Sequence, residues 1–416
     1  MSPDLEPVTG GPCRFCGHEL SLVVTDLGMS PPCQSFLARE HLDDMERFYP
    51  LVVWVCDECW LMQLREYVTP EDTFVEYAYF SSYSDSWVRH AAAFVVEMVD
   101  RLALGPSSFV VEVASNDGYL LQEVVRQGIP CLGIEPAANV AAVAEERGVP
   151  TTVAFLGEET GRKVAQVYGA ADLVVGNNVF AHVPDLVDFT RGLRELVADD
   201  GVVSLEFPHL LRLIEGRQFD TIYHEHFSYF TLRTATAALA DAGLAVFDVQ
   251  QLVSHGGSLR VLSSPREAAR APSARVAEVL AEEEAAGLDG VAGHLGFAPS
   301  VLRVRTDLVD LLTKASLDGR KVAGYGAPGK GNTLLNHCGI RPDLLPYTVD
   351  RSTYKQGRFL PGTHIPIHPP ERLAQDRPDL IVILPWNLKS EIVAQLAYAR
   401  EWGASFVVPI PELTVL

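Results

Sequence analysis

The sequence lacks three features that would point away from a water-dissolved enzyme. No apolar stretch approaches the roughly 20 residues that a transmembrane helix needs. The start, MSPDLEPVTGG, has neither the basic nor the apolar region of a secretory signal. Basic residues are also few, since 33 lysines and arginines stand against 54 aspartates and glutamates, for a net charge of −21. Such a charge repels a polyanion, so we expect a cytoplasmic protein that binds neither membrane nor nucleic acid.

Cysteine is scarce, and its seven copies are unevenly spread over the 416 residues. An odd number in so long a chain does not fit a secreted disulfide framework. Four of them form two C-x2-C pairs with 39 residues between them: Cys13, Cys16, Cys56 and Cys59. Two such pairs supply the four thiolates that zinc prefers in structural sites, which leaves no open position for catalysis. We expect structural zinc there and a free thiol at Cys33; redox pairs or reduced surface turns are the alternative.

A strand–turn–helix–strand pattern occupies residues 108–136, SFVVEVASNDGYLLQEVVRQGIPCLGIEP. The β-branched run FVVEVA predicts a strand, SNDG a turn, and YLLQEVVRQG an amphipathic helix that ends at Gly128. CLGIE predicts the second strand. In such a unit the ligand lies over the first turn, beyond the carboxyl end of the strand.

The first turn lacks the dinucleotide motif G-x-G-x-x-G. Its polar groups are Glu112 in the strand, then Asn116, Asp117 and Gly118. A pyrophosphate needs bare backbone N–H groups and glycines for close approach, whereas Asn116 and Asp117 suit a cationic amino-acid tail. Glu135 ends the second strand, where its carboxylate can accept hydrogen bonds from ribose hydroxyls. The pattern therefore favours S-adenosylmethionine over NAD.

Further strands follow in order. DLVVGNNVFAHVPDL predicts a strand ending at Asn177 and Asn178, then a helix with Pro184 near its start. DDGVVSLEF predicts another strand, and LAVFDVQQLVSHGGSLRVLSS a closing hairpin. Five parallel strands and a terminal hairpin are the layout of a class I methyltransferase. A doubly wound domain with another ligand is the alternative, because such folds host many functions.

Residues 223–231, YHEHFSYFT, place two histidines on either side of a glutamate. His224, Glu225 and His226 could form a metal site, a proton-transfer unit or a packed turn, and these residues alone do not decide. A metal would need a third ligand. His255 is available, but it lies in the predicted hairpin.

A second glycine loop lies in RKVAGYGAPGKGNTLLNHCG, again between a predicted strand and helix. Gly324, Gly329 and Lys330 match a P-loop, but Gly331 stands where Ser or Thr would bind Mg²⁺, which disfavours NTP hydrolysis. Backbone N–H groups at the helix start, with Lys330 beside them, can instead hold a diphosphate.

A cationic cluster follows this loop in YTVDRSTYKQGRFLPG. It consists of Arg351, Lys355 and Arg358. The cluster is either a second contact for an anionic ligand or a solvated face of the protein.

The four cysteines, VEVASNDGYLL, GIEP, GNNVFAHVPDL and YHEHFSYFT occur in this order along the chain. With them the chain resembles the sugar C-methyltransferases of deoxysugar and antibiotic biosynthesis, in particular C-3′ enzymes such as that of the tetronitrose pathway. The resemblance implies an α/β protein with a class I methyltransferase Rossmann-like domain between a small zinc-binding domain and a second Rossmann-like domain. The expected bounds are 1–70 for the zinc-binding domain, 71–265 for the S-adenosylmethionine domain, 266–300 for a helical connector and 301–416 for the carboxyl-terminal domain.

The resemblance also implies an activity, namely methylation of the carbon next to the ketone, C-3, of an NDP-4-keto-deoxysugar, commonly dTDP-linked. YHEHFSYF matches the active-site segment of the family, which makes His226 the base with Glu225 and Tyr223 beside it. VEYAYFSSYSDSW matches a second active-site segment through Tyr77. The positions that fall on cofactor motifs are Glu112, Asn116, Asp117, Gly118, Glu135 and Asn177.

Such a reaction needs hydrogen-bond donors at the ketone oxygen as well as a base. Tyr223, Tyr77 and His182 are the candidates, although each tyrosine could be a buried ring and His182 could cap the next helix. An NAD-dependent sugar-nucleotide oxidoreductase or epimerase would need the missing G-x-G-x-x-G and a Tyr-x3-Lys pair. A zinc-stabilised binding module without catalysis is a third hypothesis. We expect a monomer, because three domains already supply a large interior.

Overall fold

A computed structural model describes residues 10–69 and 81–416. The chain divides into two compact units, each made of separate stretches of sequence. Unit 1 comprises Met1–Leu20, Cys56–Leu210 and Phe227–Asp289, and unit 2 comprises Ser21–Val55, Leu211–His226 and Gly290–Leu416.

Unit 1 is built around a mainly parallel sheet. The strands of the unit are β3 (Met62–Leu64), β4 (Val110–Val113), β5 (Cys131–Ile134), β6 (Thr151–Thr152), β7 (Ala171–Asn177), β8 (Val197–Pro208), β9 (Ser228–Tyr229), β10 (Leu244–Leu252) and β11 (Ser258–Pro265). Within the described ranges, seven of them form one sheet in the order β10-β11-β8-β7-β4-β5-β6. Strands β4 to β8 run parallel, and the β10–β11 hairpin is antiparallel. This confirms the class I methyltransferase layout.

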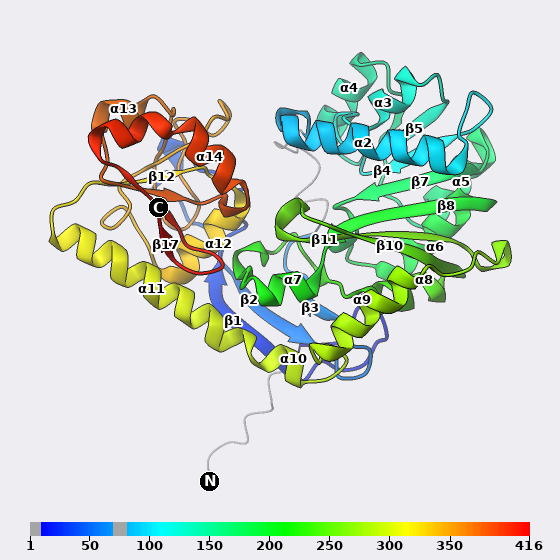
Figure 1. Cartoon of the computed structure of the whole chain (residues 1–416), viewed down its shortest axis with the longest axis horizontal. Helices are drawn as coiled ribbons and strands as arrows, with labels where there is room; N and C mark the ends of the chain where they lie inside the picture. Colours follow the sequence, from blue (N-terminus) through cyan, green and yellow to red (C-terminus); the bar gives the residue numbers. More distant parts are fainter. Residues whose placement is uncertain (1–9, 70–80) are drawn as a thin grey trace, which may run out of the picture. The chain divides into compact units, whose positions relative to one another are not determined.

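Helices cover both faces of this sheet, as buried parallel strands require. They are α2 (Asp85–Leu102), α3 (Leu121–Arg126), α4 (Ala138–Glu146), α5 (Glu158–Tyr168), α6 (Leu186–Leu196), α8 (Leu232–Asp241) and α9 (Ala274–Ala285). Figure 1 shows α2 and α3 on one side of the strands and α6 and α8 on the other. Phe94 and Met98 of α2 pack with Leu120 and Val124 against strand residues such as Leu173. The carboxyl ends of β4, β5 and β7 therefore meet at one edge, where a ligand of this fold lies.

Unit 2 contains a second mainly parallel sheet. The elements of the unit are β1 (Leu22–Ser30), β2 (Tyr49–Val55), α7 (Leu210–Glu215), α10 (Ala292–Leu295), α11 (Phe297–Leu317), β12 (Val322–Tyr325), α12 (Gly329–Cys338), β13 (Thr348–Val349), β14 (Ile367–His368), α13 (Arg372–Asp376), β15 (Leu380–Ile383), α14 (Lys389–Gln395), β16 (Ser405–Val408) and β17 (Thr414–Val415). Strands β12 to β17 form this sheet in the order β14-β13-β12-β15-β16-β17, and among the described strands only its last pair is antiparallel. The expected Rossmann-like carboxyl-terminal sheet is confirmed.

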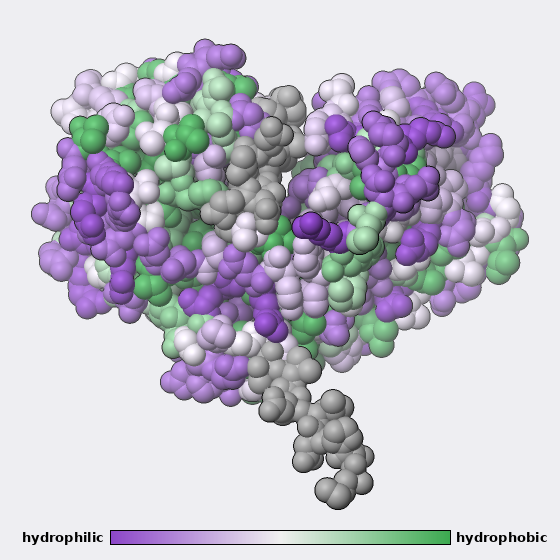
Figure 2. Space-filling view, turned by 180° about the vertical axis from the view of Figure 1, so that it is seen from behind, coloured by the Kyte–Doolittle hydropathy of each residue, from purple (hydrophilic) through white to green (hydrophobic). Residues whose placement is uncertain are grey.

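The stretch expected as a connector, 266–300, is helical, but α11 continues to Leu317. Among the described residues, no helix is both long and apolar enough to cross a membrane. Hydrophilic residues, in purple, occupy much of the face seen in Figure 2.

Candidate active site

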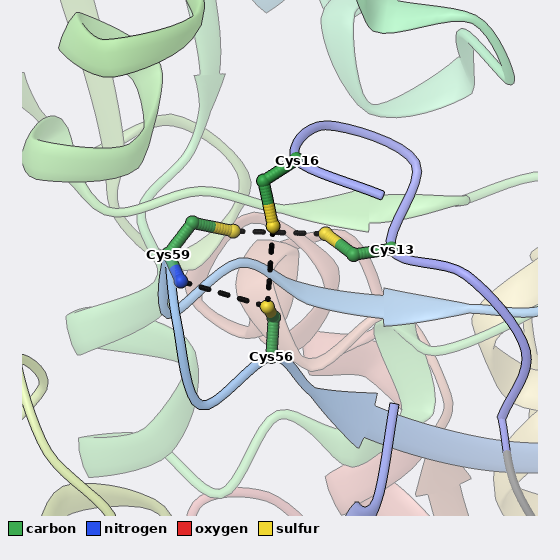
Figure 3. Close-up of side chains that lie close together, drawn as sticks. All are labelled: Cys13, Cys16, Cys56 and Cys59. Carbon is green, nitrogen blue, oxygen red and sulfur yellow. Dashed lines mark hydrogen bonds between the residues drawn. The ribbon is translucent and has the colours of Figure 1, made fainter. Parts of the chain in front are cut away.

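Four cysteine sulfurs of unit 1 point toward a common centre (Figure 3). All four lie within 4.8 Å of one another, with Cys13 and Cys59 Sγ 3.6 Å apart and Cys16 and Cys56 Sγ 3.5 Å apart. A tetrahedral ion with Zn–S bonds of about 2.3 Å needs sulfurs about 3.8 Å apart. The set therefore fits a closed zinc site. In residues 10–69 and 81–416 it is the one group of three or more such side chains close enough to share an ion.

The turn that carries Cys13 and Cys16 is hydrogen-bonded to the rest of unit 1. Gln63 Nε2 donates to Cys13 Sγ at 3.1 Å, a contact that stabilises a thiolate. The next residue, Arg14, donates to the carbonyl oxygens of Leu64 at 2.6 Å and Pro184 at 2.7 Å. A zinc ion bound by the four cysteines would hold in place the loop through which Arg14 contacts Leu64 and Pro184.

The turn after β4 requires a glycine. Gly118 has φ +74°, and a Cβ there would lie 3.0 Å from Val149 Cγ2 and 3.3 Å from Ala144 Cβ. Asn116 also has a positive φ, +50°, which asparagine tolerates better than most residues. The turn is therefore held in one conformation, as a ligand-binding turn requires.

Glu135 ties this turn to the end of β5. Its Oε2 accepts from the Asn116 N–H and its Oε1 from the Ala137 N–H, both at 2.9 Å. Burial raises the pKa of Glu135, and the two N–H bonds oppose that rise. Each carboxylate oxygen has a second lone pair, so the expected ribose contact remains a prediction compatible with these bonds.

Asp117 points to Arg147 rather than outward. Arg147 Nη1 lies 3.0 Å from Asp117 Oδ2, and the Ser82 hydroxyl bonds the same oxygen. One side of the Asp117 carboxylate is thus occupied by the protein. The turn offers a ligand the other oxygen, Oδ1, which no hydrogen bond from the described residues reaches.

Glu112 is fully buried in β4. No hydrogen bond of ordinary geometry from the described residues reaches either of its carboxylate oxygens or Oδ1 of Asn177 at the end of β7, although the Tyr119 hydroxyl is near enough to Glu112 to oppose the rise of its pKa. Burial raises the pKa of Glu112 well above its ordinary value. Buried acceptors in native proteins are nearly always paired, so these oxygens call for donors from outside. The ammonium and hydroxyl groups of S-adenosylmethionine are such donors, and the site fits that cofactor.

Sequence reasoning missed the aromatic and charged neighbours of this edge. Tyr119 Oη accepts from Asn177 Nδ2 at 3.4 Å, and Trp87 stacks on His90 with ring centroids 4.9 Å apart. His90 Nε2 contacts both carboxylate oxygens of Glu206 at 2.9 Å. The available signal was the acid in VVSLEF, a charged residue near the carboxyl end of an otherwise apolar strand.

In unit 2 the segment YHEH forms a turn, since the His226 N–H donates to the Tyr223 carbonyl at 2.8 Å. The ring centroids of Tyr223 and His226 lie 4.0 Å apart. His226 Nδ1 contacts the Thr221 carbonyl oxygen at 2.7 Å. A carbonyl only accepts, so Nδ1 carries a proton, and in the neutral ring the lone pair is then on Nε2.

The two histidines have different surroundings. His224 is 3% exposed and packs edge-on against Tyr49, with ring centroids 5.9 Å apart. Burial lowers the pKa of His224, which keeps it neutral. His226 is only partly buried. The geometry separates a buried, packed His224 from a partly exposed His226 whose Nδ1 is held by a backbone carbonyl.

Glu225 was expected beside His226. In the structure the Nδ1 bond of His226 goes to the Thr221 carbonyl, while Glu225 Oε1 accepts from the Cys33 thiol at 3.4 Å. Burial raises the pKa of Glu225 to about 7, which the thiol contact partly offsets. Cys33 is a free thiol, as expected.

The predicted substrate-binding residues of the second glycine loop also contact protein. A Cβ at Gly329 would lie 2.8 Å from Cys33 Sγ, so glycine is needed there for close packing. Lys330 Nζ donates to Asn387 Oδ1 and lies 4.4 Å from the centroid of the Trp386 ring. The amides of Gly329 and Lys330 begin α12 and have no acceptor within that helix.

The loop after β13 carries the other two predicted cations. Lys355 Nζ donates to the Ala327 carbonyl at 2.8 Å. Asp350 Oδ2 accepts from the Ala327 N–H at 2.7 Å. Arg351 is exposed beside them.

Two further candidates have different outcomes. Tyr77 lies outside the described residues. His182 ends a short 3-10 helix, Phe180–His182, in unit 1. The helix after it is capped by Asp185, whose side chain accepts from the Asp188 N–H at 3.0 Å, so His182 is not the cap.

Three family models match consecutive parts of the chain. They are described as a "Putative zinc binding domain" (residues 13–74), a "Methyltransferase domain" (87–249) and a "C-methyltransferase C-terminal domain" (253–411). The C-methyltransferase NovU of Streptomyces niveus is 39% identical over 404 residues, which cover 97% of this chain and 96% of NovU. The chain belongs to this C-methyltransferase family. It is an S-adenosylmethionine-dependent enzyme, and its four-cysteine cluster is the zinc site of the family's first domain.

Solved structures match parts of this C-methyltransferase. The PH0226 protein of Pyrococcus horikoshii is 13% identical, with 48% of this chain and 96% of that one covered and a TM-score of 0.37. Magnesium protoporphyrin IX methyltransferase of Synechocystis is 14% identical, with 43% and 77% covered and a TM-score of 0.31.

Proposed function

We propose that this C-methyltransferase removes a proton from C-3 of a dTDP-4-keto-deoxysugar and methylates the resulting enolate, in deoxysugar biosynthesis. The observation that carries the proposal is the hydrogen bond between His226 Nδ1 and the Thr221 carbonyl. In the neutral ring this bond places the proton on Nδ1, which is the tautomer that a base acting through Nε2 needs. C-methylation needs such a base, because a C–H bond must break before the new bond forms.

The carbon next to a ketone is acidic because the ketone oxygen takes up the charge as an enolate. His226 Nε2 takes the proton, and a positioned base contributes about 10²- to 10⁴-fold. Tyr223, His182 and Tyr77 are the proposed donors to the enolate oxygen, where charge develops.

The methyl group comes from S-adenosylmethionine, which supplies an electrophilic carbon on a sulfonium. The proposed residues that hold it are Glu112, Asn116, Asp117, Gly118, Glu135 and Asn177. Buried acceptor oxygens on Glu112 and Asn177 support the assignment, because a cationic ligand compensates a buried carboxylate.

The diphosphate of the substrate needs a local cationic site in a protein of net charge −21. We assign this role to Gly329 and Lys330 at the start of α12, with Lys355 and Arg351 beside the same loop. Amides at a helix start favour anions. The ammonium of Lys330 has three donors, of which one is used by Asn387.

Incubation of the enzyme with S-adenosylmethionine and a panel of dTDP-4-keto sugars tests this proposal by mass spectrometry. One added methyl on the sugar is the expected result, and no gain with any member would refute it. His226→Asn should abolish both methylation and exchange of C-3 hydrogen with D₂O, while cofactor binding stays intact. His224→Asn is the matched control, with exchange retained per folded molecule. Equal exchange in His226→Asn and wild type would remove His226 as the base.

A further inference from the structure

Helix α12 presents a polar stripe to the segment that carries the base. Lys330, Thr333 and His337 follow each other at spacings of three and four residues, so they lie on one face of the helix. All three contact residues 219–222 or their partner Trp386, and both regions belong to unit 2.

The first contact fixes the residue after Thr221. Thr333 Oγ1 donates to the Ile222 carbonyl at 3.0 Å. Thr333 is 2% exposed, so water does not compete for this bond. A buried carbonyl that loses its donor costs free energy, and the segment therefore keeps this register.

The second contact fixes the residue before Thr221. Asp220 is fully buried, and its Oδ2 accepts from Trp386 Nε1 at 2.7 Å. Lys330 Nζ faces the ring of the same Trp386, at 4.4 Å from its centroid. Burial raises the pKa of Asp220 to about 6, and the nearby Lys330 charge opposes the rise.

The third contact lies at the start of the segment. Phe219 is fully buried, with its ring edge-on to His337 and 5.3 Å between centroids. The peptide of Thr221 thus lies between three neighbours, Phe219, Asp220 and Ile222, that are held by α12 and Trp386. Its carbonyl is the group that orients His226.

We propose that this face of α12, with Trp386, is a positioning device for the catalytic histidine: it holds residues 219–222 so that the Thr221 carbonyl keeps the Nδ1 proton of His226. The proposal rests on the proposed function of His226 as base. It gives the P-loop-like sequence GAPGKGNT a role that involves no nucleotide triphosphate. Thr333, Asp220 and Trp386 are positioning residues, since they act through the Thr221 peptide.

Thr333→Val tests the device because it removes the hydroxyl and keeps the shape of the side chain. Thr306→Val is the matched control, since Thr306 Oγ1 donates to Leu302 on the exposed side of α11. Thr333→Ser should restore the bond. A small misplacement of a catalytic group costs up to about 100-fold, so we expect kcat in Thr333→Val to fall about 10- to 100-fold. The KM for the sugar nucleotide should change less than about twofold, because binding groups stay in place.

A second readout is independent of any substrate. The ¹⁵N shifts of labelled histidine, with the His226 signal assigned by His226→Asn, report which ring nitrogen carries the proton. Wild type, Thr333→Ser and Thr306→Val should show the Nδ1–H form, and Thr333→Val and Trp386→Phe a mixture with Nε2–H. An unchanged tautomer in Thr333→Val would overturn the proposal even if kcat fell, and so would a rise in KM alone. If wild type methylated no ketosugar, the proposed function would fail while the tautomer experiment still decided the positioning role.

Discussion

Replacement of Gly118 by alanine separates two demands that the turn after β4 makes on its residue. The first demand is a positive φ, +74° at Gly118. The second is space, because the new Cβ would lie 3.0 Å from Val149 Cγ2 and 3.3 Å from Ala144 Cβ. Gly128, at the other end of α3, has nearly the same φ, +71°, but nothing within 4 Å of a new Cβ. Gly128→Ala is therefore a control for the first demand alone.

The magnitudes follow from these two situations. A left-handed backbone costs a non-glycine residue about 1–2 kcal/mol, and this is the expected loss for Gly128→Ala. Overpacking adds about 1–3 kcal/mol in a well-packed site, so Gly118→Ala should lose about 2–5 kcal/mol of stability. Because Asn116 and Asp117 lie in the same turn, its displacement should also weaken cofactor binding, by about tenfold for each 1.4 kcal/mol of misplacement.

Urea denaturation measures the stability difference, and calorimetric titration with S-adenosylmethionine measures the affinity. Gly128→Ala should bind the cofactor like the wild type, and Gly118→Ala at least about tenfold more weakly. Two variants of equal stability would refute the steric argument. Equal affinities with unequal stabilities would refute the assignment of this turn to the cofactor.

Three further outcomes are expected. Removal of zinc with a strong chelator should destabilise the two cysteine turns and loosen the Arg14 contacts to Leu64 and Pro184. Activity should then be lost and should return when Zn²⁺ is added, whereas full activity with no metal detected would contradict this. Glu135→Gln should weaken cofactor binding about tenfold, since an anionic acceptor is lost, while Glu145→Gln on the exposed side of α4 should not change it. Glu225→Gln should stabilise the protein at pH 8 and not at pH 4. Burial raises the pKa of Glu225 in the folded protein from 4.5 to about 7, so folding penalises the ionised form. The wild type therefore loses stability as the pH rises from about 4.5 to about 7, by at most about 3 kcal/mol, and the neutral glutamine avoids this loss. A stability difference in urea that does not vary with pH would contradict the last of these.

The parts of the fold that the sequence predicted are those with local causes. The spacing of the two cysteine pairs is enough to predict zinc, and the periodicity of residues 108–136 predicts the strands, turn and helix of that unit. The neighbours of Gly118 are less local, because Ala144 lies in α4 and Val149 just before β6, in the following βα unit. Asn177 and Glu135 could be placed because the carboxyl ends of parallel strands share an edge.

The parts that escaped prediction depend on partners far away in the sequence. Gly329 is predicted as a phosphate-binding glycine, and the close approach of Cys33 Sγ to the position of its missing Cβ is a second reason for glycine that the loop sequence does not show. Glu225 was expected beside the His226 ring, but a backbone carbonyl holds that ring and Cys33 holds the carboxyl. Spacing along the chain carries no information about such contacts, since a turn decides which side chains face the same way.

Polar residues in the buried part of α12 could still have indicated the positioning role proposed for this helix. Its residues from Gly329 to Leu335 are buried except for Lys330, so a helix in that setting should be apolar. Thr333 and Asn332 are instead polar and nearly inaccessible. A buried polar side chain needs a partner, and here those partners are carbonyls of Ile222 and Cys33. Both carbonyls belong to segments that contact the turn of His226, so Asn332 and Thr333 are explained by what they hold in position, while Gly329 and Lys330 at the helix start keep their proposed role at the diphosphate.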